Sequence, residues 1–294
     1  MMNAARFTRY GPPEVIRIER VPVPEPGPGE VLVEVAATSF NPTEAALRAG
    51  LLRAMLPLDL PYTPGWDVAG TVVRGAGRWS AGDRVLARVD AGGGAAGHAV
   101  AKAAELVAAP AAPPLAHAAA IPVAGLTAWQ AVVEHAAVGE GEHVLINGAG
   151  GGIGGFAVQL AKSRGAFVTA TASPRSAEAV LAQGADRVVD YTARALPGGF
   201  DVLINLVPAP PEEAAALPSL LRPGGRAVSA AAPIPGHPHF AARNDPAVLA
   251  RLVSLIDAGA LTVDIAETLP LTELPEVHAR SERGAVRGKI LIVP

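Results

Sequence analysis

A glycine-rich turn between two apolar segments is the strongest constraint on the fold of this chain. The apolar run Val144–Ile146 leads into residues 148–155, which read Gly-Ala-Gly-Gly-Gly-Ile-Gly-Gly. An apolar-periodic stretch with Phe156 and Leu160 follows, and a second apolar run covers Phe167–Thr171. This order of strand, glycine turn, helix and strand is typical of the βαβ unit that binds a dinucleotide.

The glycines of this turn have a chemical reason. A pyrophosphate must approach main-chain N–H groups and the positive end of a helix, and a Cβ atom in the turn would block that approach. Two registers fit the fingerprint, Gly150-x-Gly152-x-x-Gly155 and Ala149-x-Gly151-x-x-Gly154. The sequence does not choose between them.

The end of the second strand indicates which dinucleotide is bound. NAD-binding proteins place an acidic residue about 20 residues after the turn, where it binds the ribose 2′-hydroxyl. This chain has Ser173 and Arg175 there, and a hydroxyl and a guanidinium suit a 2′-phosphate. The same segment also fits a helix start, with Ser173 as N-cap and Pro174 at the first helical position. The two interpretations are compatible, and we expect NADPH rather than NADH.

Charge and composition argue against several other classes of protein. The net charge of −3 offers no basic footprint for nucleic acid or for an acidic membrane surface. The absence of cysteine removes disulfides, thiolate nucleophiles and thiolate zinc sites. The chain has no signal-like N-terminus and no uninterrupted apolar run of about 18 residues. We therefore expect a soluble cytoplasmic protein without a nucleic-acid or membrane partner.

The pattern of short strands changes after the first hundred or so residues. Residues 1–110 carry strand patterns between Pro and Gly turns, typical of a small β-barrel, at Val15–Val21, Glu30–Ala36, Gly70–Val73, Asp83–Val89 and His98–Ala101. From His117 onward, helix and strand patterns alternate as in βαβ units.

The second half of the chain has its own expected elements. Strands are predicted at Asp201–Leu206 and Gly225–Ala231, and helices at Pro211–Leu221 and Pro246–Ala258. The chain ends in an apolar strand that has no partner nearby in sequence. We expect this strand to return to the first domain.

Motifs spaced along nearly the whole chain resemble one family. They are Tyr10-Gly-Pro-Pro-Glu-Val, Pro28-Gly-Glu-Val-Leu-Val, Asn41-Pro-Thr-Glu, Leu60-Pro-Tyr-Thr-Pro-Gly-Trp-Asp, Gly82-Asp-Arg-Val, Ala124-Gly-Leu-Thr-Ala-Trp, Gly184-Ala-Asp and the terminal Arg-Gly-Lys-Ile. In this order they resemble the zinc-independent quinone oxidoreductase branch of the medium-chain dehydrogenase/reductase superfamily. The resemblance implies an α/β protein with a GroES-like β-barrel catalytic domain of residues 1–115 and 260–294. Residues 116–259 are expected to form a Rossmann domain with a doubly wound parallel sheet.

The resemblance also implies a set of cofactor-binding residues. They are Asn41, Thr127, Phe240 and Lys289 at the nicotinamide half, Leu206 and Val207 under the cofactor, Gly151, Gly152 and Ile153 at the pyrophosphate, and Ser173, Arg175 and Tyr191 around the 2′-phosphate. Tyr191 has an alternative role as a strand-end aromatic ring packed on the sheet.

Metal ligands of the zinc-dependent relatives are replaced in this chain. Those relatives use a Cys and a Gly-His-Glu segment, whereas this chain has Gly65-Trp-Asp67, no cysteine and no four-cysteine loop. His237 and His239 lie two residues apart, but the other ligands of a zinc site are not apparent. We expect no catalytic zinc. Asp67 is expected either in a turn or as a buried carboxylate, with Arg84 as a possible partner.

The proton donor is not evident from the sequence. Many relatives have Asp where this chain has Glu44, and some double-bond reductases have a Tyr donor where Leu51 and Leu52 follow Gly50. Water, Tyr62 and His98 remain as proton sources, and Asn41 and Thr127 complete the catalytic candidates. Tyr62 and His98 also have purely structural interpretations, in a proline turn and at a strand start.

Together these features predict hydride transfer from NADPH to a small-molecule electron acceptor, either a quinone or an α,β-unsaturated carbonyl. The alternative is an NADPH-binding sensor or structural protein without turnover, because such a protein would also keep the cofactor turn without an identifiable acid. A homodimer is expected through the strand Gly225–Ala231, whose outer edge lacks a protective Lys or Pro.

Overall fold

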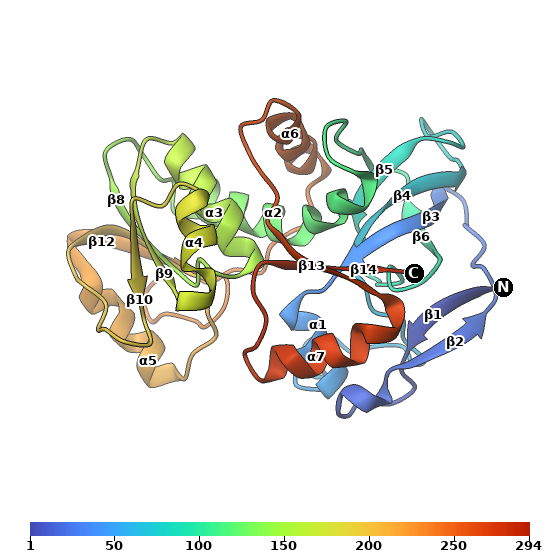
Figure 1. The fold of residues 1–294 in the computed structure, drawn as a ribbon, viewed down its shortest axis with the longest axis horizontal. Coiled ribbons are helices and arrows are strands. Elements are labelled where there is room, and N and C mark those ends of the chain that lie inside the picture. Colours follow the sequence, from blue (N-terminus) through green and yellow to red (C-terminus); the bar gives the residue numbers. More distant parts are fainter. The chain divides into compact units, whose positions relative to one another are not determined.

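The computed structural model describes residues 1–294, which form two compact units. Unit 1 comprises Met1–Val123, Asn244–Ala258 and Ile265–Pro294, and unit 2 comprises Ala124–Arg243 and Gly259–Asp264. Both ends of the chain therefore belong to unit 1 (Figure 1). None of the helices has the length and apolar character needed to cross a bilayer.

Unit 1 is built around a seven-stranded, mostly antiparallel sheet. In sheet order its strands are β13 (Ile265–Pro270), β14 (Lys289–Val293), β3 (Glu30–Ser39), β4 (Asp67–Arg74), β5 (Arg84–Arg88) and β7 (Val107–Ala108), with β6 (His98–Lys102) paired to β3. Two further strands, β1 (Met2–Arg6) and β2 (Arg17–Val21), form a separate antiparallel pair.

Alternation of side chains explains the burial of β3. Val31, Val33 and Val35 share one face and are 0%, 0% and 6% exposed, whereas on the other face Glu34 is exposed and Leu32 is buried. The three valines join a core with Val68, Val85 and other residues of the barrel strands. A strand with one buried face has a fixed register, because a slip of one residue would turn its apolar face to water.

The terminal strand returns to unit 1, as predicted. In β14, Leu291 pairs antiparallel with Ser39 and Ile292 with Thr38, so the last strand lies beside β3. Its other neighbour, β13, runs parallel to it. The pairing brings Lys289, at the start of β14, to the end of β3.

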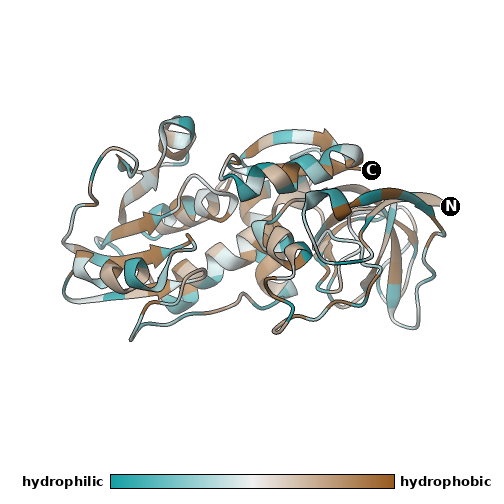
Figure 2. Cartoon of the chain, turned by 90° about the horizontal axis from the view of Figure 1, so that it is seen from below, coloured by the Kyte–Doolittle hydropathy of each residue, from teal (hydrophilic) through white to brown (hydrophobic).

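Four helices cover parts of unit 1 or begin in it. They are α1 (Pro42–Ala49), α2 (Pro122–Trp129, which continues into unit 2), α6 (Pro246–Asp257) and α7 (Leu274–Glu282), with single 3-10 turns at Pro13–Val15, Leu115–Ala120 and Leu271–Glu273. Figure 2 shows hydrophilic and hydrophobic residues alternating along the helices, as expected for helices buried on one face.

Helix α6 belongs to a different unit from the one expected. The sequence analysis assigned Pro246–Ala258 to the dinucleotide domain, whereas the structure groups this helix with unit 1. Asp257 at its end accepts hydrogen bonds from the N–H groups of Ala111 and Ala112, at 2.8 and 3.2 Å. Asn244 before it donates to the carbonyl of Arg88 at 3.0 Å.

A buried arginine connects α1 to α7. Arg48 is 0% exposed, and its guanidinium donates to the carbonyl of Gly11 and to the carboxylate of Glu282. His278 on α7 is also buried, with its ring 5.0 Å from that of Phe40. Burial and the nearby Arg48 charge lower the pKa of His278 to about 3, so this histidine is neutral in the folded protein.

Unit 2 is a doubly wound α/β domain, as predicted. Its parallel sheet has the order β10 (Arg187–Asp190), β9 (Phe167–Ala172), β8 (His143–Asn147), β11 (Phe200–Asn205) and β12 (Leu221–Ser229). The helical elements are the end of α2, a π-helical turn (Gln130–His135), α3 (Gly152–Ser163), α4 (Pro174–Ala182), α5 (Pro211–Ala216) and a 3-10 turn (Leu217–Leu220). The strand order reverses between β8 and β11, the position at which such sheets bind ligands.

The central strands of unit 2 are apolar on both faces. Val144, Leu145 and Ile146 of β8 are all 0% exposed. The same holds for residues 202–204 of β11. Near-continuous apolar runs are expected in a parallel sheet that is covered on both sides.

The prediction of an open strand edge along Gly225–Ala231 is wrong at the C-terminal end of this strand. β12 ends at Ser229, and the chain's own residues 237–240 cover this end of the strand. The N–H of Ala227 donates to the ring of His237 at 3.3 Å, and that of Ser229 to the carbonyl of Pro238 at 3.0 Å. Ser229 is therefore not an edge-facing position, and the homodimer stays a prediction without this argument.

Ser229→Lys should destabilise the fold rather than only change association. The Ser229 side chain is 0% exposed and is hydrogen-bonded to Ala232 and Asn205. An unpaired ammonium here should cost on the order of 4 kcal/mol or more in unfolding free energy, whereas Ser229→Ala should cost about 1–2 kcal/mol. Urea unfolding of both variants measures the difference. A Lys variant as stable as the parent, with altered association, would restore the open-edge interpretation.

Candidate functional site

The structure selects one register for the glycine turn. A Cβ atom on Gly154 would lie 2.4 Å from the Cα of Ala149, so α3 packs directly against the backbone of the turn. A Cβ atom on Gly155 would meet only the side chain of Gln183, at 2.8 Å. The third glycine of the fingerprint serves this close packing. The register is therefore Ala149-x-Gly151-x-x-Gly154.

The start of α3 is shaped to receive an anion. Gly151 is the exposed N-cap of α3, and the nearest atom to a Cβ placed there is 3.6 Å away, leaving open space. Gly152 and Ile153 form the first helical positions and are half-buried. The N–H groups of a first helical turn have no partners within the helix, and they carry the positive end of its dipole. Binding of a pyrophosphate by these three residues stays a prediction, and the open N-cap is compatible with it.

Uncharged side chains connect the carboxyl ends of four strands in unit 2. Thr171 donates to Asn147, which donates to Asn205, at 2.9 Å each, and Asn205 donates to Ser229 at 3.1 Å. No sequence pattern indicated this chain of contacts. Because every member is neutral, the sheet presents no carboxylate at the reversal of strand order.

Residues after β11 lie beside the glycine turn. Leu206 and Val207 are half-buried, and a Cβ atom on Gly148 would come within 2.6 Å of the Val207 side chain. Gly148 has φ +94°, which favours glycine, and its N–H donates to Thr171 at 2.8 Å. The structure thus brings together the turn and the two residues expected under the cofactor.

The segment expected at the 2′-phosphate begins α4 next to the turn. Ser173 is the N-cap of α4 and Pro174 is its first residue, which confirms the helix-start interpretation. A Cβ atom on Gly150 would lie 2.3 Å from Ser176 in the first turn of α4. Arg175 is exposed, as is Tyr191, whose residue surface is 58% accessible. Both interpretations of Tyr191 stay predictions.

Two further residues of unit 2 occupy helical and loop positions. Thr127 lies in α2 and is 6% exposed. Phe240 is the last residue of the segment that covers β12, and its ring centroid is 4.2 Å from that of His135. Their expected roles at the nicotinamide remain predictions.

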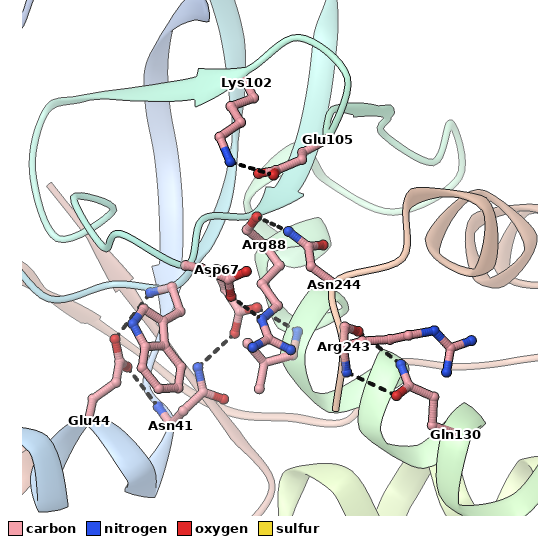
Figure 3. A network of polar contacts seen from close by, with 12 residues as sticks. Asn41, Glu44, Asp67, Arg88, Lys102, Glu105, Gln130, Arg243 and Asn244 are labelled. Atoms are coloured by element: carbon pink, nitrogen blue, oxygen red, sulfur yellow. Dashed lines mark hydrogen bonds and ion pairs between the residues drawn. The ribbon is translucent and has the colours of Figure 1, made fainter. Parts of the chain in front are cut away.

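A buried polar cluster in unit 1 contains Asn41 and Lys289. Asp67 Oδ2 accepts from Asn41 at 2.9 Å and from Lys289 at 3.4 Å, and Lys289 donates to Asn41 Oδ1 at 2.9 Å (Figure 3 shows the Asn41–Asp67 bond). Ser39 also donates to Asp67, whose other oxygen accepts from the N–H of Val123 at 2.7 Å. The prediction that Arg84 pairs with Asp67 is wrong, because Arg84 donates to the carbonyl of Pro113.

Glu44 fastens the start of α1 to the loop before β4. Its carboxyl accepts from the N–H of Asn41 at 3.1 Å, of Gly65 at 2.7 Å and of Trp66 at 3.1 Å. Figure 3 shows the bond between Glu44 and Asn41. The Asn-Pro-Thr-Glu motif carries this signal, since an N-cap followed by Glu at the third helical position is typical of a helix start. Burial is the largest influence on Glu44 and raises its pKa to about 7, although the N–H of Gly65 acts in the opposite direction.

Tyr62 is linked to this cluster through Trp66. The indole N–H of Trp66 donates to the Tyr62 hydroxyl at 3.1 Å, and the Trp66 main chain donates to Glu44. Burial, followed by the nearby Glu44 charge, raises the pKa of Tyr62 above its usual value. The phenol therefore keeps its proton near neutral pH and can act as a donor. Tyr62 lines a cavity of about 370 Å³ together with Asp59, Asp90 and Gly92.

His98 lies apart from Asn41. It begins β6, its main-chain N–H donates to the sulfur of Met2 at 3.2 Å, and its Nδ1 is buried without a partner. Its cavity of about 470 Å³ shares Thr63 and the 91–93 loop with the Tyr62 cavity. No hydrogen bond or ion pair joins His98 to the cluster.

The residues at the expected metal position do not suit zinc. No group of three or more His, Cys, Asp or Glu side chains is close enough to hold a metal ion. The cluster at Asn41 and Asp67 already contains a cation, the Lys289 ammonium. His237 accepts from Ala227, and His239 is hydrogen-bonded to Ala231. We derive no step through a metal.

Glu44→Gln should change how stability depends on pH. A carboxyl whose folded pKa of about 7 exceeds its unfolded value of 4.5 stabilises the fold below pH 4.5 and loses that contribution as pH rises through 7. Relative to the Gln variant, the parent should lose on the order of 3 kcal/mol of unfolding free energy between pH 5 and pH 8.

Urea unfolding of the parent and Glu44→Gln at both pH values measures this difference. His278 acts in the opposite direction, because its lowered pKa costs stability as pH falls below 6.5, but this effect is present in both proteins and cancels. A stability difference that is the same at both pH values would contradict the buried carboxyl.

Known proteins resemble both units. Residues 27–113 match the model of the alcohol dehydrogenase GroES-like domain, and residues 183–292 match that of a zinc-binding dehydrogenase. A chloroplastic quinone-oxidoreductase homologue of Spinacia oleracea is 40% identical over 202 residues, covering 65% of this chain and 61% of the relative. The match thus spans about three fifths of that relative's length.

Two longer matches cover the whole chain. A chloroplastic NADPH-dependent alkenal/one oxidoreductase of Arabidopsis thaliana is 29% identical, covering 100% of this chain and 80% of the relative. The solved structure of the quinone oxidoreductase from Coxiella burnetii has a TM-score of 0.90 at 27% identity, covering 100% of this chain and 99% of that one. The chain therefore belongs to the medium-chain dehydrogenase/reductase superfamily, in its quinone oxidoreductase branch.

Proposed function

We propose that this protein is an NADPH-dependent reductase that transfers hydride to a quinone or an α,β-unsaturated carbonyl without zinc. The observation that carries the proposal is the glycine turn, whose close packing at Gly154 leaves Gly151 open beside the Ser173–Arg175 helix start. Two relatives support the proposed acceptor and cofactor, since one is a quinone-oxidoreductase homologue and the other an NADPH-dependent alkenal/one oxidoreductase.

Unit 2 would bind the phosphate groups of the cofactor. The N–H groups at the start of α3 would hold the pyrophosphate, and Ser173 and Arg175 would hold the 2′-phosphate. The neutral Asn147–Asn205 contacts at the strand ends favour this choice, because they add no negative charge near an anionic ligand. NADPH, when bound, supplies the hydride.

Unit 1 would supply polar groups for the reaction. Asn41 and Lys289 form the part of the buried cluster expected at the nicotinamide half. Tyr62 is the proposed proton donor because its phenol lines a cavity and is hydrogen-bonded to Trp66, although its raised pKa makes it a weaker acid than an ordinary tyrosine. Water and His98 remain alternatives, and no hydrogen bond or ion pair links His98 to the cluster.

Turnover of NADPH with a panel of quinones and enones tests the proposed activity against the sensor alternative. We expect NADPH oxidation that depends on the acceptor and is unchanged by EDTA, with no stoichiometric zinc by elemental analysis. NADPH binding without turnover on any acceptor would favour the sensor. Turnover lost with EDTA and restored by zinc would contradict a zinc-independent reaction.

Arg175→Ala should weaken NADPH binding selectively. Loss of a charge-assisted hydrogen bond should cost about 1.5–3 kcal/mol in NADPH affinity and leave NADH nearly unchanged. Arg164→Ala is a matched control, because Arg164 lies at the opposite end of α3 from the glycine turn and donates to Val138. Fluorescence titration with both cofactors measures the effect. Equal losses for NADPH and NADH would refute the 2′-phosphate assignment.

A further inference from the structure

The Asn41 side chain has a complete set of partners within unit 1. Its Nδ2 donates to Asp67 Oδ2 at 2.9 Å and to the Ser39 carbonyl at 3.3 Å. Its Oδ1 accepts from the Lys289 ammonium at 2.9 Å. An amide nitrogen carries two hydrogens, so both donors of Asn41 are used inside the protein.

The chemistry of the neighbours fixes the direction of this amide. A carboxylate such as Asp67 only accepts hydrogen bonds, and an ammonium such as Lys289 only donates them. A reversed Asn41 would place its NH₂ group against the Lys289 ammonium and its oxygen against the Asp67 carboxylate. Asp67 is 0% and Lys289 is 3% exposed, so water cannot relieve such a mismatch.

Asp67 is held in place from three further sides. Its Oδ2, which binds Asn41, also accepts from the Ser39 hydroxyl. Its Oδ1 accepts from the N–H of Val123 at 2.7 Å. Lys289 supplies its counter-charge at 3.4 Å. The carboxylate therefore cannot turn away from Asn41 without leaving several buried donors unpaired.

We propose that Asp67 is a positioning residue that locks Asn41 as a hydrogen-bond acceptor toward the nicotinamide half of the cofactor. The proposal rests on the NADPH function proposed above. The only hydrogen-bonding capacity that Asn41 has left is one lone pair of its Oδ1. The cofactor group that binds there must therefore be a donor, either a ribose hydroxyl or the NH₂ of the nicotinamide carboxamide. The carbonyl oxygen of a quinone or enone only accepts. Asn41 therefore contacts the cofactor and does not stabilise charge on the acceptor's oxygen.

Asp67→Asn tests this assignment through a difference between ligands. The variant replaces a carboxylate that only accepts with an amide that can also donate, so the Asn41 NH₂ is no longer held from that side, and we expect NADPH affinity and the KM for NADPH to worsen by about tenfold. The KM for the quinone and the affinity for 2′,5′-ADP, which lacks the nicotinamide half, should stay within about twofold. Fluorescence titration and steady-state kinetics supply the readouts. Unchanged NADPH affinity, or equal losses for NADPH and 2′,5′-ADP, would overturn the proposal.

A double variant separates positioning from simple destabilisation. Asp67→Asn alone leaves the Lys289 charge buried without a counter-charge, so its Tm should fall. Asp67→Asn with Lys289→Met removes both charges, and we expect the Tm to recover while NADPH affinity stays below that of Lys289→Met alone, which accounts for the place of Lys289 at the nicotinamide half. Recovery of NADPH affinity together with the Tm would mean a purely structural role and would refute the proposal.

Lys102→Met provides the control for removing a lysine, because Lys102 is an exposed residue of unit 1 paired with Glu105. Its NADPH affinity and Tm should match those of the parent. Parent protein that binds neither NADPH nor 2′,5′-ADP would show that the proposed function has failed. Parent protein that binds NADPH, with an Asp67→Asn variant that binds it equally well, would show that only the positioning role has failed.

Discussion

The buried carboxylate of Asp67 is the contact on which the chemistry of unit 1 depends. It begins β4 and accepts hydrogen bonds from Ser39 at the end of β3, from Asn41 before α1 and from Lys289 at the start of β14. A fourth donor, the N–H of Val123, lies near the start of α2. Removing one partner from such a pair is costly because the other charge stays buried. The cluster therefore ties the terminal strand to the residues expected at the cofactor.

The same cluster contains an internal cation at the position where a metal was considered. The ammonium of Lys289 sits between Asn41 and Asp67, and its positive charge balances the carboxylate. Glu44 holds the adjacent helix start through three N–H groups without supplying a ligand to this cation. The resulting arrangement is rigid and directional, which suits positioning of a bound cofactor more than Lewis-acid chemistry.

Local patterns predicted most of the strands and the glycine turn. The apolar runs of β8 and β11 and the alternation in β3 are visible in the sequence because burial follows directly from strand geometry. Helix α1 was missed, although its Asn-Pro-Thr-Glu start carries a capping signal. The alanines that follow blur the apolar period on which a helix prediction depends.

Long-range contacts could not be predicted in this way. Asp67 and Lys289 are 222 residues apart, and nothing in the periodicity of either segment indicates that they pair. The cover over β12 comes from a loop without a strand pattern, so the edge looked open in the sequence. The grouping of α6 with unit 1 depends on Asp257 meeting residues 111 and 112, again a contact between distant segments.

A crystal structure of the NADPH complex tests the central claim most directly. The account predicts the pyrophosphate on the N–H groups that begin α3, the 2′-phosphate at Ser173 and Arg175, and a hydroxyl or NH₂ group of the nicotinamide half donating to Asn41 Oδ1. It also predicts that the Asn41 amide keeps its NH₂ toward Asp67. A complex in which Asn41 donates to the cofactor, or in which the phosphates lie away from the glycine turn, would contradict it.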